Sequence, residues 1–120
     1  MPSRSNRPSS RRWGLAVAAA ALGLAGLSLG AAAQAPGPAT HTVVMEAVAF
    51  QPPALTIKAG DRVVWVNRDP FPHTATSPAF DSKDIAPGAS WTYTPNAPGD
   101  VPYVCTLHPT MKGLLRVTTR

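Results

Sequence analysis

Residues 101–118 have the sequence VPYVCTLHPTMKGLLRVT, which indicates two β-strands joined by a loop that carries metal-binding side chains. The predicted strands are 101–105 and 114–118, because both are short, rich in valine or leucine and bounded by turn residues. Between them a thiol, an imidazole and a thioether recur at every third position, as Cys105, His108 and Met111. A loop of this length can place all three around one point, so the stretch predicts both a β-protein and a metal site.

Upstream segments predict further strands. Valine-rich or alternating runs, separated by glycine and proline, are residues 41–50, 55–58, 62–67 and 90–94. Strand spacings of about 8–12 residues are typical of a β-sandwich. We therefore expect an all-β, antiparallel Greek-key β-sandwich, formed by residues 41–120 as a single domain.

The composition excludes several classes of protein. The 120 residues are 44% hydrophobic and 14% charged, which argues against a disordered chain, and 14 prolines argue against a helical bundle. The single cysteine excludes an intrachain disulfide, a four-cysteine zinc or iron–sulfur site, and a binuclear copper centre with two bridging thiolates. The net charge of +5 comes largely from four arginines in the first 12 residues. We therefore expect no nucleic-acid partner.

Residues 1–33 have the features of a cleaved signal peptide. A basic start precedes an apolar run that ends in small residues at 31–33. A retained membrane anchor is the alternative, but an Ala/Gly-rich run inserts weakly. Arg11-Arg12 partly resembles a twin-arginine signal, although the general secretory (Sec) route is favoured. We expect a flexible tether at 34–40 and a periplasmic monomer with no membrane insertion after cleavage.

A second imidazole completes the predicted ligand set. His73 follows the predicted strand 62–67, and loops at the same end of a sandwich lie close together. Taken singly, Cys105 and Met111 could be core residues and the histidines ordinary loop residues. Together, two imidazoles, a thiolate and a weak thioether are the ligands of one mononuclear type 1 (blue) copper. The predicted metal ligands are His73, Cys105, His108 and Met111.

The chain resembles the cupredoxins, most closely the amicyanin-like and plastocyanin-like small blue-copper proteins. The resemblance covers about residues 43–117 and includes DRVVWVN at 61–67, FPHT at 71–74 and GDVPYVC at 99–105, besides the Cys-x-x-His-x-x-Met loop. There are departures, because Thr74 stands where the family often has asparagine and Leu107 where amicyanin has proline.

The resemblance implies an electron-transfer protein rather than an enzyme, in which the copper cycles between Cu(II) and Cu(I). It also implies redox donor and acceptor proteins that dock near His108. The apolar rim for this docking would be Phe71, Pro72, Leu107 and Pro109.

Two other functions stay open. A periplasmic copper carrier without a dedicated electron-transfer role needs exchangeable metal, usually from Met/His-rich motifs, but the chain has only three His and three Met. A zinc-binding or metal-free binding module is the other, although a thioether is a poor zinc ligand. The pattern favours the electron carrier.

Overall fold

The computed structural model describes residues 37–120 and, in the leader, Gly14, Ala16, Ala18, Ala20, Ala21, Gly23 and Gly26. The chain divides into two units, Met1–Ala33 and Gln34–Arg120, and the second contains every described strand. The predicted signal peptide lies almost wholly outside the described residues. Within the described part of the chain, no helix has the length and apolar character needed to cross a membrane.

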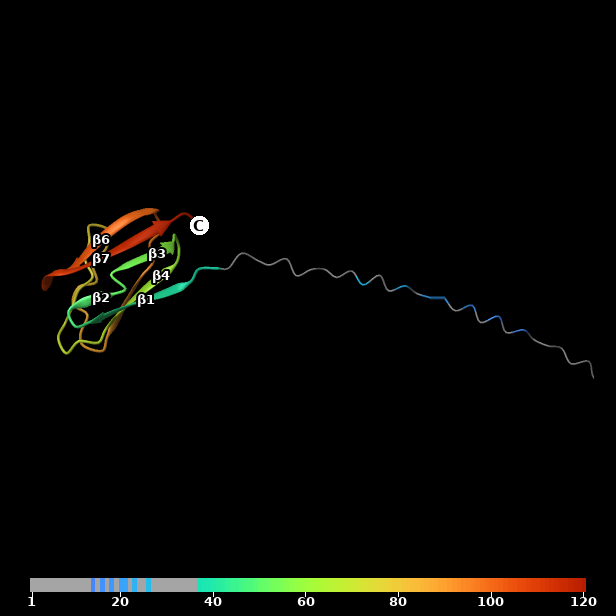
Figure 1. Ribbon diagram of the computed structural model, residues 1–120, viewed down its shortest axis with the longest axis horizontal. Helices are drawn as coiled ribbons and strands as arrows, with labels where there is room; N and C mark the ends of the chain where they lie inside the picture. The colour runs from blue at the N-terminus through green and yellow to red at the C-terminus, as the bar shows by residue number, and fades with distance from the viewer. Residues whose placement is uncertain are drawn as a thin grey trace, which may run out of the picture. The chain divides into compact units, whose positions relative to one another are not determined.

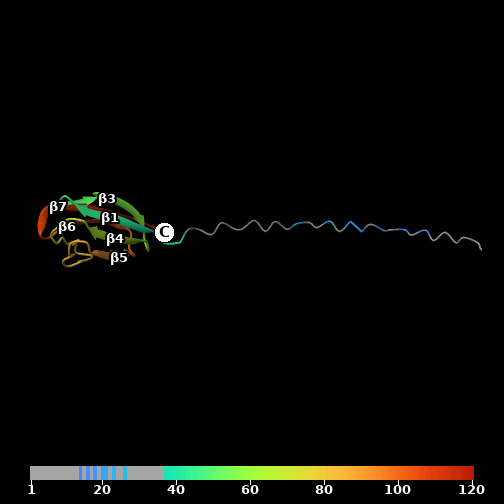
Figure 2. The ribbon, with the colours of Figure 1, turned by 90° about the horizontal axis from the view of Figure 1, so that it is seen from below.

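The second unit is built from short strands (Figure 1). They are β1 (Thr40–Glu46), β2 (Ala49–Gln51), β3 (Ala54–Lys58), β4 (Arg62–Asn67), β5 (Ser90–Tyr93), β6 (Gly99–Cys105) and β7 (His108–Thr118). One sheet has the order β2-β1-β4-β5 and the other β3-β7-β6. Figure 2 shows β3 and β7 on one side and β4 and β5 on the other. The predicted all-β sandwich is confirmed.

Both sheets are mixed rather than purely antiparallel. β1 runs parallel to β4, and β3 runs parallel to β7, whereas the remaining pairs are antiparallel. Two-residue hairpins impose antiparallel pairing, but a connection that crosses to the other sheet does not. The chain leaves β1 through β2, crosses to β3 and returns to β4, so the β1–β4 direction is set by this crossover.

Two elements differ from the expected strands. Residues 41–50 form a hairpin rather than one strand, because the chain reverses at Ala47 and Val48, whose φ angles are 53° and 56°. β7 begins at His108 rather than at residue 114, so only Thr106 and Leu107 separate it from β6. The predicted ligand loop is therefore mostly strand.

The core lies between the two sheets. Alternate residues of the strands point into it, among them Val43 and Trp65 from one sheet and Tyr103 and Leu115 from the other. The rings of Trp65 and Tyr103 meet edge to face with centroids 5.5 Å apart. Burial raises the pKa of Tyr103 to about 12, so its hydroxyl stays protonated. The packed core fixes the strand ends from which the site is built.

Candidate metal centre

Three of the predicted ligands lie together in the structure. The ligand atoms of His73, Cys105 and His108 are all within 4.8 Å of one another. Cys105 Sγ is 3.7 Å from His73 Nδ1 and 3.6 Å from His108 Nδ1. Cys105 and His73 are fully buried, and His108 is half-buried. One thiol and two imidazoles therefore face a common point, at which a single metal ion would contact all three.

The strand ends position Cys105 and His108. Cys105 is the last residue of β6 and His108 the first of β7, and the two are paired across the hairpin. A register shift between Val104 and Cys105 interrupts the regular ladder at this point. A β-bulge re-aims side chains, so it explains how residues near the end of a ladder turn toward one site.

His73 reaches the site from a different part of the chain. It lies in the segment after β4, where its backbone pairs with Ile85: His73 N donates to Ile85 O at 3.2 Å and Ile85 N to His73 O at 2.7 Å. This bridge fixes a residue outside the regular strands. The expectation that His73 would approach the Cys105 loop is therefore met by the geometry.

Thr74 ties the two parts of the site together. Its backbone N–H donates to Cys105 Sγ at 3.3 Å, which joins the segment after β4 to the cysteine. Its hydroxyl accepts the Thr106 N–H at 2.8 Å and shares a hydrogen bond of 3.0 Å with the Thr106 hydroxyl. Thr74 thus holds the cysteine loop although it stands where cupredoxins often have asparagine.

Asp69 belongs to the site, and the sequence analysis missed it. Its carboxylate Oδ2 lies 2.7 Å from His73 Nε2, on the ring side opposite Nδ1. Burial raises the pKa of Asp69, but hydrogen bonds from Val48 N–H, the His73 ring and Ala47 N–H outweigh burial and keep the pKa below its usual value. An ionised carboxylate only accepts hydrogen bonds, so the 2.7 Å contact requires a proton on His73 Nε2.

Met111 lies within β7 rather than in a loop. Its side chain is buried, on the same face of the strand as the core residues Leu115 and Val117. A weakly held thioether beside a thiolate and two imidazoles suits copper better than zinc. Met111 stays a predicted ligand.

The residues of the predicted apolar rim lie near the two histidines or next to them in the sequence. The Phe71 ring contacts the rings of both His73 and His108, with centroids 5.2 and 5.4 Å apart. Phe71 is 37% exposed and Leu107 is 46% exposed. Pro72 and Pro109 are exposed as well. All residues of the predicted rim are thus accessible.

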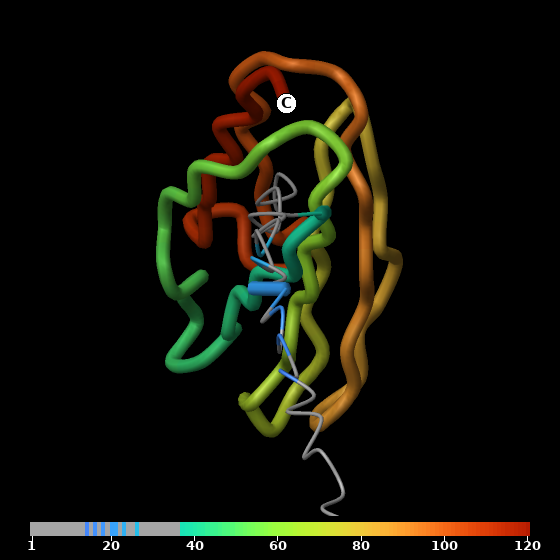
Figure 3. Tube along the Cα trace, turned by 90° about the vertical axis from the view of Figure 1, so that its right-hand side faces the viewer, coloured from blue at the N-terminus to red at the C-terminus, as the bar shows by residue number. Residues whose placement is uncertain are grey.

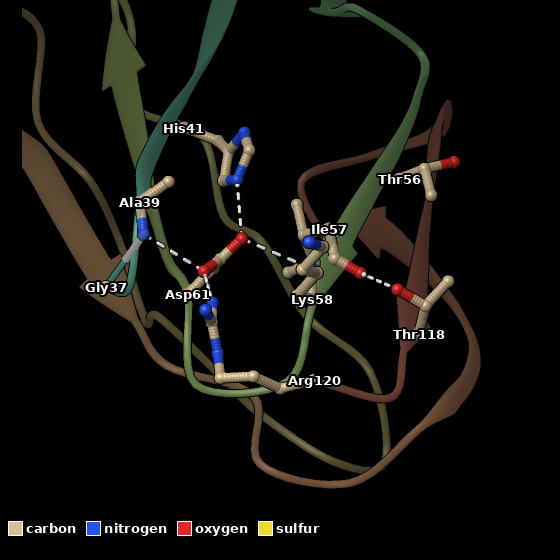
Figure 4. Close-up of a pocket in the computed structure, with 9 residues that line it drawn as sticks. All are labelled: Gly37, Ala39, His41, Thr56, Ile57, Lys58, Asp61, Thr118 and Arg120. Atoms are coloured by element: carbon tan, nitrogen blue, oxygen red, sulfur yellow. Dashed lines mark hydrogen bonds and ion pairs between the residues drawn. The ribbon is translucent and has the colours of Figure 1, made fainter. Parts of the chain in front are cut away.

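A cavity of about 320 Å³ lies at the other end of the strands, lined in part by Thr118, the last residue of β7 (Figure 4). At its centre the buried carboxylate of Asp61 accepts hydrogen bonds from the His41 ring and from Ala39 and Lys58 N–H, and pairs with Arg120. These groups, His41 foremost, hold the pKa of Asp61 well below its usual value.

Figure 3 shows the C-terminal end beside the β3–β4 turn, where Arg120 Nε also donates to Ala59 O at 2.9 Å. The Asp61 carboxylate is saturated with donors. We therefore assign this end of the domain to stability rather than to chemistry.

Comparison with known proteins identifies the family of the chain. A family model described as a cupredoxin-like domain matches residues 16–117. Amicyanin-alpha of Methylorubrum extorquens is 36% identical over 106 residues, covering 82% of this chain and 88% of that protein. Plastocyanin of Scenedesmus fuscus is 35% identical over 86 residues, covering 59% of this chain and 88% of that protein.

The fold of the chain is also similar to that of a solved amicyanin structure. A methionine-to-alanine variant of amicyanin in its Cu(I) form matches this chain with a TM-score of 0.63 and 26% identity, covering 70% of this chain and 85% of that one. The resemblance to amicyanin-like and plastocyanin-like proteins is confirmed.

Proposed function

The chain belongs to the cupredoxin-like domain family, and from that premise we propose that it is a periplasmic electron-transfer protein with one mononuclear type 1 copper. The observation that carries the proposal is the cluster of one thiol and two imidazoles, whose ligand atoms lie within 4.8 Å of one another. We assign the copper ligands as His73, Cys105, His108 and Met111.

The donor set fits copper in both oxidation states. Copper bound there supplies a one-electron Cu(II)/Cu(I) couple. The protein supplies the surroundings: Cys105 and His73 are 0% exposed, so water is kept from their ligand atoms. The Thr74 N–H donates to Cys105 Sγ, and the paired strand ends hold the ligand residues in place. A framework fixed in this way changes little when one electron is gained or lost.

We propose that electrons enter and leave at the His108 edge. His108 is the half-buried member of the ligand set, and the Phe71 ring contacts its ring. Phe71 is exposed, as are Pro72 beside His73 and Leu107 and Pro109 on either side of His108 in the sequence. An apolar surface of this kind suits brief docking of a redox donor and then of an acceptor. We propose that the protein is a monomer. We propose an electron-carrier role rather than an enzymatic one, because the described cavity lies at the other end of the strands and its carboxylate is already paired.

We propose that residues 1–33 are a cleaved signal peptide that directs residues 34–120 to the periplasm by the Sec route. The support is the basic start, the apolar run and the small residues at 31–33. We also propose a flexible tether over residues 34–40. Its last part joins the folded domain, because Ala39 N donates to Asp61, Ala39 O accepts from Arg62 N, and β1 begins at Thr40.

Repeated oxidation and reduction in the presence of chelators tests this function. The copper-loaded protein is reduced with ascorbate and reoxidised with ferricyanide, with EDTA present to remove Cu(II) and bathocuproine disulfonate to remove Cu(I). We expect reversible one-electron cycles with the copper retained in both states. His41→Gln, which changes the histidine at the other end of the strands, should behave like the wild type. His108→Gln should lose copper to the chelators.

The alternative is a copper carrier. Rapid loss of copper from the wild type to either chelator would contradict the electron-transfer proposal and favour the carrier.

A further inference from the structure

The Asp69 carboxylate connects the metal cluster to a surface turn. It is 7% exposed and accepts three hydrogen bonds: Ala47 N to Oδ1 at 2.8 Å, Val48 N to Oδ2 at 2.9 Å and His73 Nε2 to Oδ2 at 2.7 Å. Two of these donors belong to the β1–β2 turn, more than 20 residues earlier in the chain. One side chain thus joins the turn to the ring of His73.

The turn itself has a strained backbone. Both Ala47 and Val48 have positive φ angles, 53° and 56°, in a region that non-glycine residues rarely adopt and that a β-branched valine adopts least of all. A backbone of this kind persists where its surroundings hold it. Here the Asp69 carboxylate holds it, because it accepts both N–H groups of the turn.

The backbone around Asp69 is fixed as well. Asp69 N donates to Asn67 Oδ1 at 2.9 Å, and Asn67 Nδ2 donates to Phe71 O at 2.8 Å and Ile85 O at 2.9 Å. Arg68 N donates to Met45 O on β1 at 2.9 Å. The carboxylate is thus fixed by bonds that do not involve His73, so it sets the orientation of the His73 ring rather than the reverse.

We propose that Asp69 is the positioning residue of His73 and that it takes its own position from the Ala47–Val48 turn. By accepting the Nε2 proton it fixes the tautomer of His73 and aims the Nδ1 lone pair at Cys105. This inference rests on the proposed copper function for its consequence at the metal, but the fixed tautomer is a property of the copper-free protein.

The first test needs neither copper nor a variant. Long-range ¹⁵N–¹H correlation spectra of the copper-free protein at neutral pH distinguish the two neutral tautomers of each histidine. We expect His73 to be wholly in the Nε2–H form, with an Nε2 proton that exchanges slowly because it is buried and bonded. A His73 ring in the Nδ1–H form, or in a mixture of both forms, would overturn the proposal while leaving the copper function untouched.

Asp69→Asn tests the same point by substitution. An amide has one oxygen, so it cannot accept from all three donors, and it carries no charge. We expect a mixture of His73 tautomers in the copper-free variant and, with copper bound, a higher reduction potential, because His73 becomes a weaker donor to Cu(II). Asp69→Glu keeps the charge and both acceptor oxygens and should recover part of the wild-type behaviour.

Two control variants separate positioning from charge and from backbone strain. Asp84→Asn removes an equal charge from an exposed carboxylate one residue before Ile85 and should change neither the tautomer nor the potential. Val48→Gly keeps the N–H and relieves the positive φ, so His73 should stay in the Nε2–H form. If Asp69→Asn matched Asp84→Asn in both measurements, Asp69 would have no positioning role.

Discussion

Replacing Thr74 by alanine should weaken the link between the two segments that form the metal site. The Thr74 side chain is 3% exposed, and its hydroxyl makes three hydrogen bonds: with Thr106 N at 2.8 Å, with the Thr106 hydroxyl at 3.0 Å and with the Thr76 hydroxyl at 3.0 Å. Thr74→Ala removes all three. Thr74→Ser keeps the hydroxyl and is the matched control.

The size of the effect follows from those bonds. A hydrogen bond contributes about 0.5–1.5 kcal/mol net to the free energy of unfolding. Thr106 is exposed and Thr76 half-buried, so water can replace part of what their groups lose. We therefore expect Thr74→Ala to lower the free energy of unfolding by about 1.5–2 kcal/mol, the low end of what three such bonds contribute together. In a domain of this size each kcal/mol corresponds to about 4–8 °C in Tm.

Thermal unfolding of the copper-free protein, followed by circular dichroism, measures this change. Thr74→Ser keeps the hydroxyl but removes a buried methyl group, so it should lower the free energy of unfolding by about 0.8 kcal/mol at most, less than Thr74→Ala does. Equal stability of the alanine and serine variants would refute the reasoning, because it would mean that the Thr74–Thr106 link contributes nothing.

Three further predictions concern other parts of the domain. Gly113→Ala should lower the free energy of unfolding by about 1–3 kcal/mol or more, measured by urea denaturation, because a Cβ there would lie 2.7 Å from Tyr103 Cε1 and closer still to the end of that ring. Asp61→Asn should remove part of the acid sensitivity of the fold. The pKa of Asp61 is lowered in the folded protein, so its ionised carboxylate stabilises the fold fully above the ordinary carboxyl pKa of about 3.9. This stabilisation is lost as the pH falls toward the pKa of Asp61 in the folded protein. The free energy of unfolding should therefore depend less on pH between about pH 2 and 5 in the variant. Leu107→Glu should slow electron transfer to a protein partner in stopped-flow measurements while leaving the copper spectrum unchanged, whereas an unaltered rate would exclude the rim as a docking surface.

The strand pattern could be predicted where it is local. Residues 62–67 were expected as a strand and form β4 at those bounds, because a short continuous run of large apolar residues lies between a glycine turn and a proline. The turn at Ala47 and Val48 could not be predicted, since neither residue has turn chemistry. It exists because Asp69 binds both N–H groups from a position more than 20 residues away. The parallel pairs likewise depend on contacts between distant segments.

The metal site, like the strands, could be predicted where the signal lies within one short segment and not where it depends on distant contacts. Cys105 and His108 could be found because their spacing within one short segment carries the signal, and His73 because it follows a clear strand. Asp69 could not be found, because an aspartate before a proline is an ordinary turn residue in sequence. Only the 2.7 Å contact with His73 shows that it belongs to the site. Residues that hydrogen-bond a metal ligand, rather than the metal, have no characteristic spacing in the sequence.

The visible absorption and electron paramagnetic resonance spectra of the Cu(II)-loaded protein test the central claim most directly. Coordination by Cys105, His73 and His108 predicts an intense thiolate-to-copper band and a narrow copper hyperfine splitting, both of which should be absent from Cys105→Ser. A pale wild-type protein with a wide hyperfine splitting, or a Cys105→Ser variant with undiminished colour, would contradict the assignment of this cluster as a type 1 copper site.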